Sequence, residues 1–265
     1  MTTDVDEARD WHGNTVDCAA CRHHTQNSAG ACSVMHACVQ DRYARRIDRF
    51  FSWNPELAND YLDHPYFEVR AVAAKYADLF HLTRLLRDPD ETVRWSAAQR
   101  LPPRYLRELR SDSHREVRIR VAARIEGADL FFMRNDEDYY VRMVVARRIA
   151  THLLQLMMSD PESGVRRIVA RRIDARLLAS MASDPDADVR LEVAQRLPPD
   201  QLTQLQRDLD CRVRYEAASR IDVQRLPAML EDVDQMVREM ALQRLADQRS
   251  FVPPVAAIKL AEHLL

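Results

Sequence analysis

The chain has 265 residues and a formal net charge of −2, with 46% hydrophobic and 30% charged residues. This near-neutral charge argues against a general nucleic-acid binder, which needs a strong positive bias. Only 4 glycines and 7% aromatic residues argue against a β-sandwich or barrel. No apolar run reaches the about 18 residues of a membrane span, and the acidic N-terminus MTTDVDEARD is not a secretory signal. We therefore expect a cytoplasmic protein that works in a reducing environment and does not contact a membrane.

The first distinctive segment is a group of cysteines near the N-terminus. Four of the 5 cysteines lie within 21 residues with the spacing C-x2-C-x10-C-x5-C, and they are Cys18, Cys21, Cys32 and Cys38. In a reducing compartment this pattern favours a metal site over disulfides. The four thiolates can form either the shell of one ion or the corners of a cluster. From the spacing alone, structural zinc is the commoner outcome. Nearby histidines can replace a thiolate or hydrogen-bond the site, and these are His23, His24 and His36.

A Val-Arg pair recurs every 24 residues through most of the chain. Its valines are Val69, Val93, Val117, Val141, Val165, Val189, Val213 and Val237. A fixed period of this kind is typical of a solenoid, in which each unit packs only on its neighbours. We interpret Val39–Asp48 as a degenerate ninth copy, followed by a six-residue insertion at Arg49–Asn54. Phe50, Phe51 and Trp53 in that insertion are expected to pack at the junction of the cysteine segment with the repeats.

Each copy carries the signals of one α-helix and one much shorter helix. An Asp stands five residues before the Val in seven copies, and Pro often follows it, as in Asp88-Pro89. We interpret this Asp as the N-cap and the Pro as the first helical residue, and Asp88 to Glu91 matches a capping box. The helix is predicted to run about 12 residues until prolines such as Pro102 stop it. The rest of the period leaves room for only about six to eight helical residues, which fits a 3₁₀ segment or a single α-turn.

The Arg after each Val lies inside the apolar helix face, because successive residues are about 100° apart around a helix. A guanidinium in that place needs an acidic or carbonyl partner. Since the Asp series is in phase with it, we predict an Arg–Asp ladder along the repeats rather than an arginine stripe that binds phosphate. The predicted ladder arginines are Arg70, Arg94, Arg118, Arg142, Arg166, Arg190, Arg214 and Arg238.

Two further features of the helices concern their ends and their opposite face. A second arginine series is expected to complement the last carbonyls of its own helix. Its members are Arg100, Arg124, Arg148, Arg172, Arg196, Arg220 and Arg244. The opposite face fits either a partner surface or packing between neighbouring repeats, and it carries Arg120, Arg147, Arg167 and Arg171 among Ile119, Met143, Val144 and Ile168.

Cys211 is interpreted as an ordinary surface residue. The sequence shows no catalytic triad, Gly-rich phosphate loop or H-E-x-x-H motif, so no catalytic residue is predicted.

The DPDxxVRxxAAxRL pattern at a 24-residue period, behind a cysteine-rich N-terminal segment, resembles the leucine-rich variant (LRV) repeat proteins. The resemblance covers about residues 15–246. It implies an all-α fold of alternating α and 3₁₀ helices in a right-handed superhelical solenoid. It also implies a [4Fe–4S] cluster bound through four cysteines, which match Cys18, Cys21, Cys32 and Cys38, with zinc as the alternative metal. The family implies no settled activity. The single helix also resembles HEAT-like repeats of the phycobilin-lyase type, whose longer period fits this chain less well.

These interpretations predict an N-terminal cysteine-rich segment with a degenerate first repeat (1–48), a repeat stack (49–246) and a C-terminal cap (247–265) that ends in a helix at Val255–Leu265. The function predicted first is a non-enzymatic scaffold that binds a protein partner and carries a [4Fe–4S] cluster with a redox, sensing or structural role. The alternative is a nucleic-acid-binding helical-repeat protein with a structural zinc or iron–sulfur site. A redox enzyme is disfavoured because no substrate site is visible.

Overall fold

A computed structural model of the chain describes residues 7–250, without the side chains of residues 248–250. The cap helix predicted at Val255–Leu265 lies outside these residues. The chain comprises two compact units, Met1–Val145 and Ala146–Leu265. The described part has no β-strand, only isolated bridges at Arg9–Thr15 and Ser33–Ala37. Within residues 7–250, every helix is too short or too polar to span a membrane.

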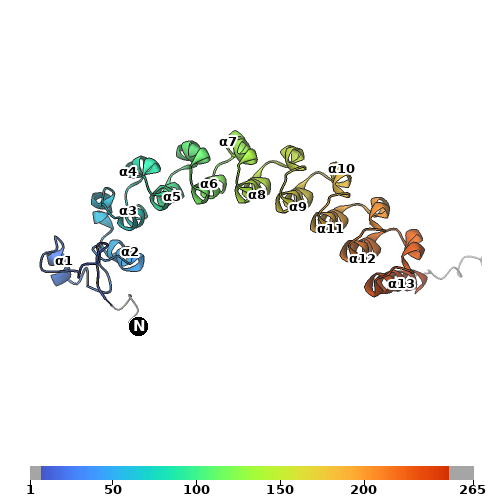
Figure 1. Cartoon of the computed structure of the whole chain (residues 1–265), viewed down its shortest axis with the longest axis horizontal. Coiled ribbons are helices and arrows are strands. Elements are labelled where there is room, and N and C mark those ends of the chain that lie inside the picture. Colours follow the sequence, from blue (N-terminus) through green and yellow to red (C-terminus); the bar gives the residue numbers. More distant parts are fainter. Residues whose placement is uncertain (1–6, 251–265) are drawn as a thin grey trace, which may run out of the picture. The chain divides into compact units, whose positions relative to one another are not determined.

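The first unit begins with the cysteine-bearing segment and continues into repeats (Figure 1). Its elements are α1 (His24–Ser28), α2 (Ala44–Trp53), η2 (Pro55–Tyr61), α3 (Phe67–Ala73), α4 (Leu79–Leu82), η3 (Thr83–Arg87), α5 (Glu91–Arg100), η4 (Pro103–Ser111), α6 (Arg115–Ala122), α7 (Gly127–Phe132), η5 (Met133–Asn135) and α8 (Tyr139–Arg148), within which the boundary falls. Helices α2, α3, α5 and α6 pack against one another in that order. The elements labelled η are 3₁₀ helices.

The second unit repeats the same alternation of a longer α-helix with a short segment. Its elements are η6 (Thr151–Met157), α9 (Ser163–Arg172), α10 (Ala175–Leu178), η7 (Ala179–Met181), α11 (Ala187–Arg196), η8 (Pro199–Leu205), α12 (Cys211–Arg220), η9 (Val223–Met229) and α13 (Gln235–Ser250). In this unit α9, α11, α12 and α13 lie side by side, and the short helices form a second row (Figure 1). The predicted alternation of α and 3₁₀ helices is confirmed.

The residues of the hydrophobic core recur at the same positions in each repeat. The recurring Val is 0% exposed in all eight copies, from Val69 to Val237. The short helices bury a leucine at the matching position of each repeat, and these are Leu82, Leu106, Leu130, Leu154, Leu178, Leu202 and Leu226. Each unit therefore has a continuous apolar layer between its row of α-helices and its row of short helices.

The α-helices begin later than predicted, because the recurring Asp makes a turn before the helix rather than capping it. Asp88 Oδ1 accepts the N–H of Asp90 (2.9 Å), and Asp90 in turn caps α5 by accepting the N–H of Thr92 (2.8 Å). The N-cap and capping box predicted at Asp88 are therefore wrong. The helices of the repeats before α13 have only 7 to 10 residues, fewer than predicted. Two aspartates in one turn can each accept N–H groups, and the first is already held by an arginine.

The degenerate copy at the N-terminal end is misplaced in the sequence prediction. Helix α2 begins at Ala44, 23 residues before α3 begins at Phe67, so this spacing is nearly regular. The predicted insertion at Arg49–Asn54 is instead the second half of α2 and its C-cap. Asp41 precedes α2 as Asp88 precedes α5, accepting the N–H of Tyr43 (2.9 Å) and the guanidinium of Arg46 (2.8 Å). No Val-Arg pair marks this helix, which is why the sequence pattern places it wrongly.

Candidate metal centre

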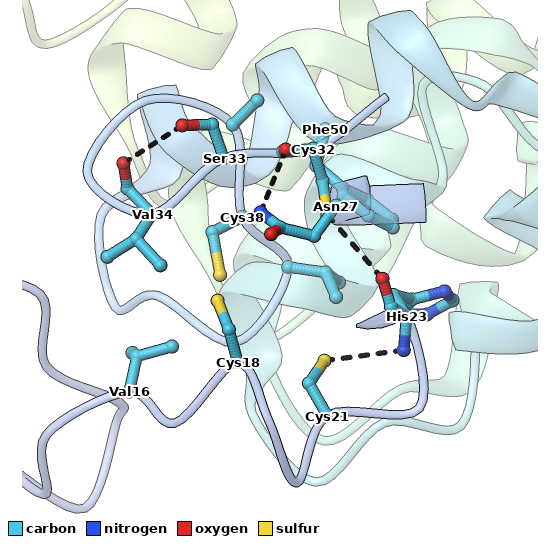
Figure 2. Close-up of a pocket in the computed structure, with 12 residues that line it drawn as sticks. Val16, Cys18, Cys21, His23, Asn27, Cys32, Ser33, Val34, Cys38 and Phe50 are labelled. Atoms are coloured by element: carbon cyan, nitrogen blue, oxygen red, sulfur yellow. Dashed lines mark hydrogen bonds between the residues drawn. The ribbon is translucent and has the colours of Figure 1, made fainter. Parts of the chain in front are cut away.

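The structure brings all four predicted cysteines to one cavity in the N-terminal segment (Figure 2). Cys38 is buried, whereas the other three are partly exposed. The sulfurs of Cys18 and Cys38 point toward one another across the cavity, and that of Cys21 lies on another side. The remaining walls are mostly apolar, with Val16, Val34, Ala37, Val39 and Phe50 among them. The cavity therefore offers four sulfur ligands among mostly apolar neighbours.

Three local turns place the cysteines around this cavity. The CxxC pair forms a turn in which Cys21 N–H donates to the Cys18 carbonyl (3.4 Å), directly before α1. Asn27 in α1 donates from its side chain to the Cys32 carbonyl (3.1 Å) and holds the third cysteine. The Cys38 N–H donates to the carbonyl of Arg46 in α2 (3.1 Å). The fourth ligand is thus tied to the first repeat helix, while the other three come from the preceding loop.

The cavity gathers four cysteines as candidate metal ligands. A tetrahedral zinc holds each sulfur at about 2.3 Å, so its four ligands must form one compact group. Within residues 7–250, no three His, Cys, Asp or Glu side chains come together in such a group. In an iron–sulfur cluster each cysteine binds its own iron, so the sulfurs surround a larger space. The four cysteines that line one cavity are ligands of the kind such a cluster uses, and zinc finds no support in residues 7–250.

The histidines near the cysteines are engaged elsewhere. His24 is exposed at the start of α1. His36 accepts from Arg49 through Nδ1 (2.7 Å) and packs against Trp53, with ring centroids 5.5 Å apart. His23 alone lines the cavity, but its Nε2 is hydrogen-bonded to the Tyr61 hydroxyl. The structure therefore does not support the prediction that a histidine replaces a thiolate. His23 lies next to the cysteines and can support them.

Burial controls the chemistry of the thiols. It raises the pKa of Cys38 to about 11, with hydrogen bonds from the Gln40 and Asp41 main chain opposing the shift. Burial also raises the pKa values of Cys18 and Cys32. A raised pKa keeps a thiol protonated and poorly nucleophilic, so these cysteines are not set up for covalent catalysis. A metal bound here would have to displace these protons, because only the thiolate is a metal ligand.

The cavity is also the junction with the first repeat. Phe50 and Phe51 of α2 are buried, and Phe50 forms part of the cavity wall. Asn54, the C-cap of α2, donates from its side chain to the Ala31 carbonyl (2.9 Å) in the cysteine loop. Trp53 contacts His36 but stays 43% exposed. The predicted packing of these aromatic residues at the junction is confirmed for the two phenylalanines and holds for one face of Trp53.

The arginine after each Val is a structural residue. In six of the eight copies its Nε and Nη2 donate to the two carboxylate oxygens of the Asp that precedes the next repeat, with Nε–Oδ2 distances of 2.7–2.9 Å. The pairs are Arg70–Asp88, Arg94–Asp112 and Arg118–Asp136 in the first unit, and Arg166–Asp184, Arg190–Asp208 and Arg214–Asp232 in the second. The predicted ladder is confirmed for these six pairs, and their guanidinium groups are not available to bind phosphate.

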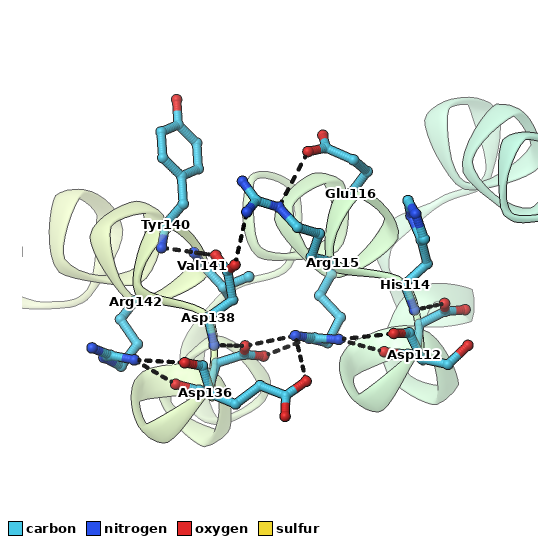
Figure 3. A network of polar contacts seen from close by, with 12 residues as sticks. Asp112, His114, Arg115, Glu116, Asp136, Asp138, Tyr140, Val141 and Arg142 are labelled. Carbon is cyan, nitrogen blue, oxygen red and sulfur yellow. Dashed lines mark hydrogen bonds and ion pairs between the residues drawn. The ribbon is translucent and has the colours of Figure 1, made fainter.

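Exposed side chains extend this network at the repeat boundaries. In Figure 3, Arg115 lies between Glu116 and Asp138, and its Nη1 is 3.1 Å from Asp138 Oδ2. Arg142 donates from Nη1 to the main-chain carbonyl of Asp136 (2.8 Å). All eight ladder arginines bind the carbonyl of the turn that precedes their own helix, and six of them also bind the carboxylate of the neighbouring repeat.

The second arginine series binds a different helix from the one predicted. Arg196, near the end of α11, donates to the carbonyls of Ala170 (2.6 Å) and Ile173 (2.8 Å), which end the preceding helix α9. Arg172, Arg220 and Arg244 do the same in the second unit. These arginines satisfy terminal carbonyls, as expected, but those of the preceding repeat. Which carbonyls these arginines reach depends on how neighbouring repeats pack against each other, and the sequence of a single helix does not show this packing.

The opposite helix face also serves contacts between repeats. Arg167 and Arg171 of α9 both bind Glu192 of α11, and the Arg167 Nε–Oε1 distance is 3.1 Å. The Arg120 guanidinium lies 4.4 Å from the centroid of the Trp95 ring in the preceding repeat. Val144 and Ile168 are buried. Of the two interpretations of this face, the structure supports packing between neighbouring repeats.

Comparison with known proteins gives three findings. A family model described as "LRV protein FeS4 cluster" matches residues 8–60, which include all four cysteines of the cavity. The chain is 50% identical over 96 residues to an uncharacterized 27.7 kDa protein in the nifB 3′ region of Rhodobacter capsulatus, a match that covers 36% of this chain and only 39% of that relative. A solved structure described as a leucine-rich repeat variant with a novel repetitive protein structural motif is 40% identical, with a TM-score of 0.84, over 87% of this chain and 99% of that one.

Proposed function

The chain belongs to the leucine-rich repeat variant family, and on that basis we propose that it is a non-enzymatic repeat scaffold carrying a [4Fe–4S] cluster on Cys18, Cys21, Cys32 and Cys38. The observation that carries this proposal is the convergence of these four cysteines on one cavity. Their position inside the segment similar to the FeS4 family model supports the choice of cluster.

The surroundings of the cavity support a cluster that both closes the end of the repeats and communicates with solvent. When bound, a [4Fe–4S] cluster supplies one-electron transfer. Cys38 and Phe50 of α2 are buried in the cavity wall, so the site is part of the packing of the first repeat. The other three cysteines are partly exposed, so a redox partner or an oxidant can approach from that side. We propose a redox or sensing role on the exposed side and a stabilising role on the buried side.

We further propose that the repeats bind a protein. The ladder arginines are bound to aspartates inside the stack, so these guanidinium groups are not available to a polyanion. In the first unit the short helices instead expose large apolar side chains, with Phe80 92%, Phe132 56% and Tyr105 40% exposed. Exposed apolar groups on successive elements are typical of protein-binding surfaces.

Metal analysis of protein purified without oxygen tests the cluster. The measurements are iron, acid-labile sulfide and zinc per chain, together with a visible absorption spectrum. We expect about four iron and four sulfide ions per chain and a brown protein, as the [4Fe–4S] composition requires. A colourless protein with one zinc, or with no metal after anaerobic expression, would overturn the proposal.

A further inference from the structure

One residue, His23, connects two of the predicted cluster ligands to the first repeat. Its main-chain N–H donates to Cys21 Sγ (3.4 Å), and its carbonyl accepts from the Cys32 thiol (3.8 Å), as Figure 2 shows. Its imidazole is buried, only 4% exposed, and forms part of the cavity wall. On its far side Nε2 is hydrogen-bonded to the hydroxyl of Tyr61, the last residue of η2.

The contacts around the imidazole are specific. Its ring packs against Phe50, with centroids 5.1 Å apart, and against Tyr61 at 5.8 Å. The Tyr61 hydroxyl is hydrogen-bonded to Nε2, and the Gln26 side chain is a further polar neighbour of the ring. The imidazole is therefore held in place by aromatic packing and by its hydrogen bond to Tyr61.

We infer that His23 is a positioning residue for the cluster, held in place by Tyr61 of the first repeat. This inference rests on the proposed [4Fe–4S] function. The His23 side chain sets where its own main chain lies, and that main chain reaches both Cys21 and Cys32. The first repeat thereby fixes the geometry of a loop that it does not belong to.

The main-chain contact has a consequence for the bound state. A donor to a ligating sulfur stabilises its negative charge, and the bond strengthens as that charge grows on reduction. The His23 N–H therefore favours the reduced state and raises the reduction potential. The Cys32 contact behaves in the opposite way, because a ligating thiolate has no proton to donate to the His23 carbonyl. When Cys32 binds the cluster as a thiolate, that contact is lost. The N–H bond to Cys21 is then the remaining link between His23 and the ligands.

The Tyr61→Phe variant tests the inference because it removes the hydroxyl and keeps the ring contacts. Tyr66→Phe is the matched control, since the Tyr66 hydroxyl also reaches the N-terminal segment but donates to the Arg42 carbonyl (3.1 Å) and not to His23. His23→Leu removes the hydrogen bond to Tyr61, and His23→Gln restores a group that can bond to Tyr61. Far-UV circular dichroism and a urea titration confirm that each variant is folded.

The readouts are the rate of iron loss to a chelator and the midpoint potential of the anaerobic protein. We expect Tyr61→Phe and His23→Leu to lose iron about tenfold faster, the scale of second-sphere effects on metal sites. Both should show a more negative midpoint potential, His23→Gln should recover most of each effect, and Tyr66→Phe should match the wild type. Wild-type rates and potentials in both Tyr61→Phe and His23→Leu would overturn the inference and leave the cluster standing. Wild-type protein without iron would instead overturn the proposed function and the inference with it.

Discussion

Arg94 binds Asp112 of the next repeat through two parallel hydrogen bonds, Nε to Oδ2 at 2.7 Å and Nη2 to Oδ1 at 2.8 Å. The same arginine donates from Nη1 to the Asp88 carbonyl (2.8 Å) in the turn before its own helix. One guanidinium therefore fixes the position of two consecutive turns. The second arginine series reaches back to the preceding helix, so neighbouring repeats are joined in both directions.

Removing one ladder arginine should be strongly destabilising. In Arg166→Ala the carboxylate of Asp184 stays nearly buried without its partner, and we expect a loss of about 3 kcal/mol in the free energy of unfolding. Urea denaturation followed by circular dichroism measures it. Arg176→Ala is the control, because Arg176 pairs with Asp174 at an exposed site, and its stability should hardly change. A double-mutant cycle with Asp184→Ala should show strong coupling, and additive effects would refute the ladder at this pair.

The second arginine series should contribute less per residue. Arg196→Met keeps the aliphatic stem but leaves the carbonyls of Ala170 and Ile173 without their donor. We expect a loss of about 1–2 kcal/mol, typical of a cation at a partly buried helix C-terminus. Gln195→Ala, at the exposed position beside it, should be nearly neutral. Equal stabilities for the two variants in the same urea experiment would show that these hydrogen bonds contribute nothing.

Acidification should weaken the second unit through its ion pairs. For Asp232, burial acts to raise the pKa, but hydrogen bonds from Arg214 outweigh it and leave the pKa below its ordinary value. A hydrogen bond from Arg171 likewise lowers the pKa of Glu192. Groups with a lower pKa in the folded state stabilise the fold fully above their unfolded pKa, about 4, and lose that contribution as the pH falls through the folded pKa. Urea midpoints should therefore fall between about pH 5 and pH 2, and less steeply in Asp232→Asn. An unchanged slope in that variant would contradict the assignment.

The paired state of the arginines also predicts weak interaction with polyanions. We expect the protein to elute from heparin or a DNA column at low salt, because its ladder guanidinium groups are bound to carboxylates. Chromatography at two salt concentrations measures this directly. Tight retention that falls steeply with added salt would favour the nucleic-acid alternative over a protein partner.

The features that the sequence predicts correctly are those that recur. The buried Val, the short second helix and the Arg–Asp pairing each follow from a residue pattern that returns every 24 residues in the same environment. The errors arise where tertiary contacts decide between local alternatives. Asp88 and Asp90 are both suitable N-caps, and only the ion pair with Arg70 shows why the first one serves as a turn. Helix α2 lacks the Val-Arg pair, so its register could not be read from the pattern.

The candidate site divides in the same way. The spacing of the cysteines predicts their convergence, because ligands of one site must meet whatever the loops between them do. The sequence names His23, His24 and His36 as candidates to hydrogen-bond the site, but it does not single out His23. Its partner Tyr61 is 38 residues away in another element, and neither residue stands in a recognisable motif.

The measurement that tests the central claim most directly is the iron and sulfide content of single cysteine-to-serine variants purified without oxygen. Cys38→Ser removes the buried ligand against α2, and Cys211→Ser changes an exposed cysteine at the start of α12. We predict that Cys38→Ser loses most of its iron and the cluster absorption, while Cys211→Ser keeps the wild-type content. Full iron content and an unchanged spectrum in Cys38→Ser would show that the four-cysteine cavity is not the cluster site.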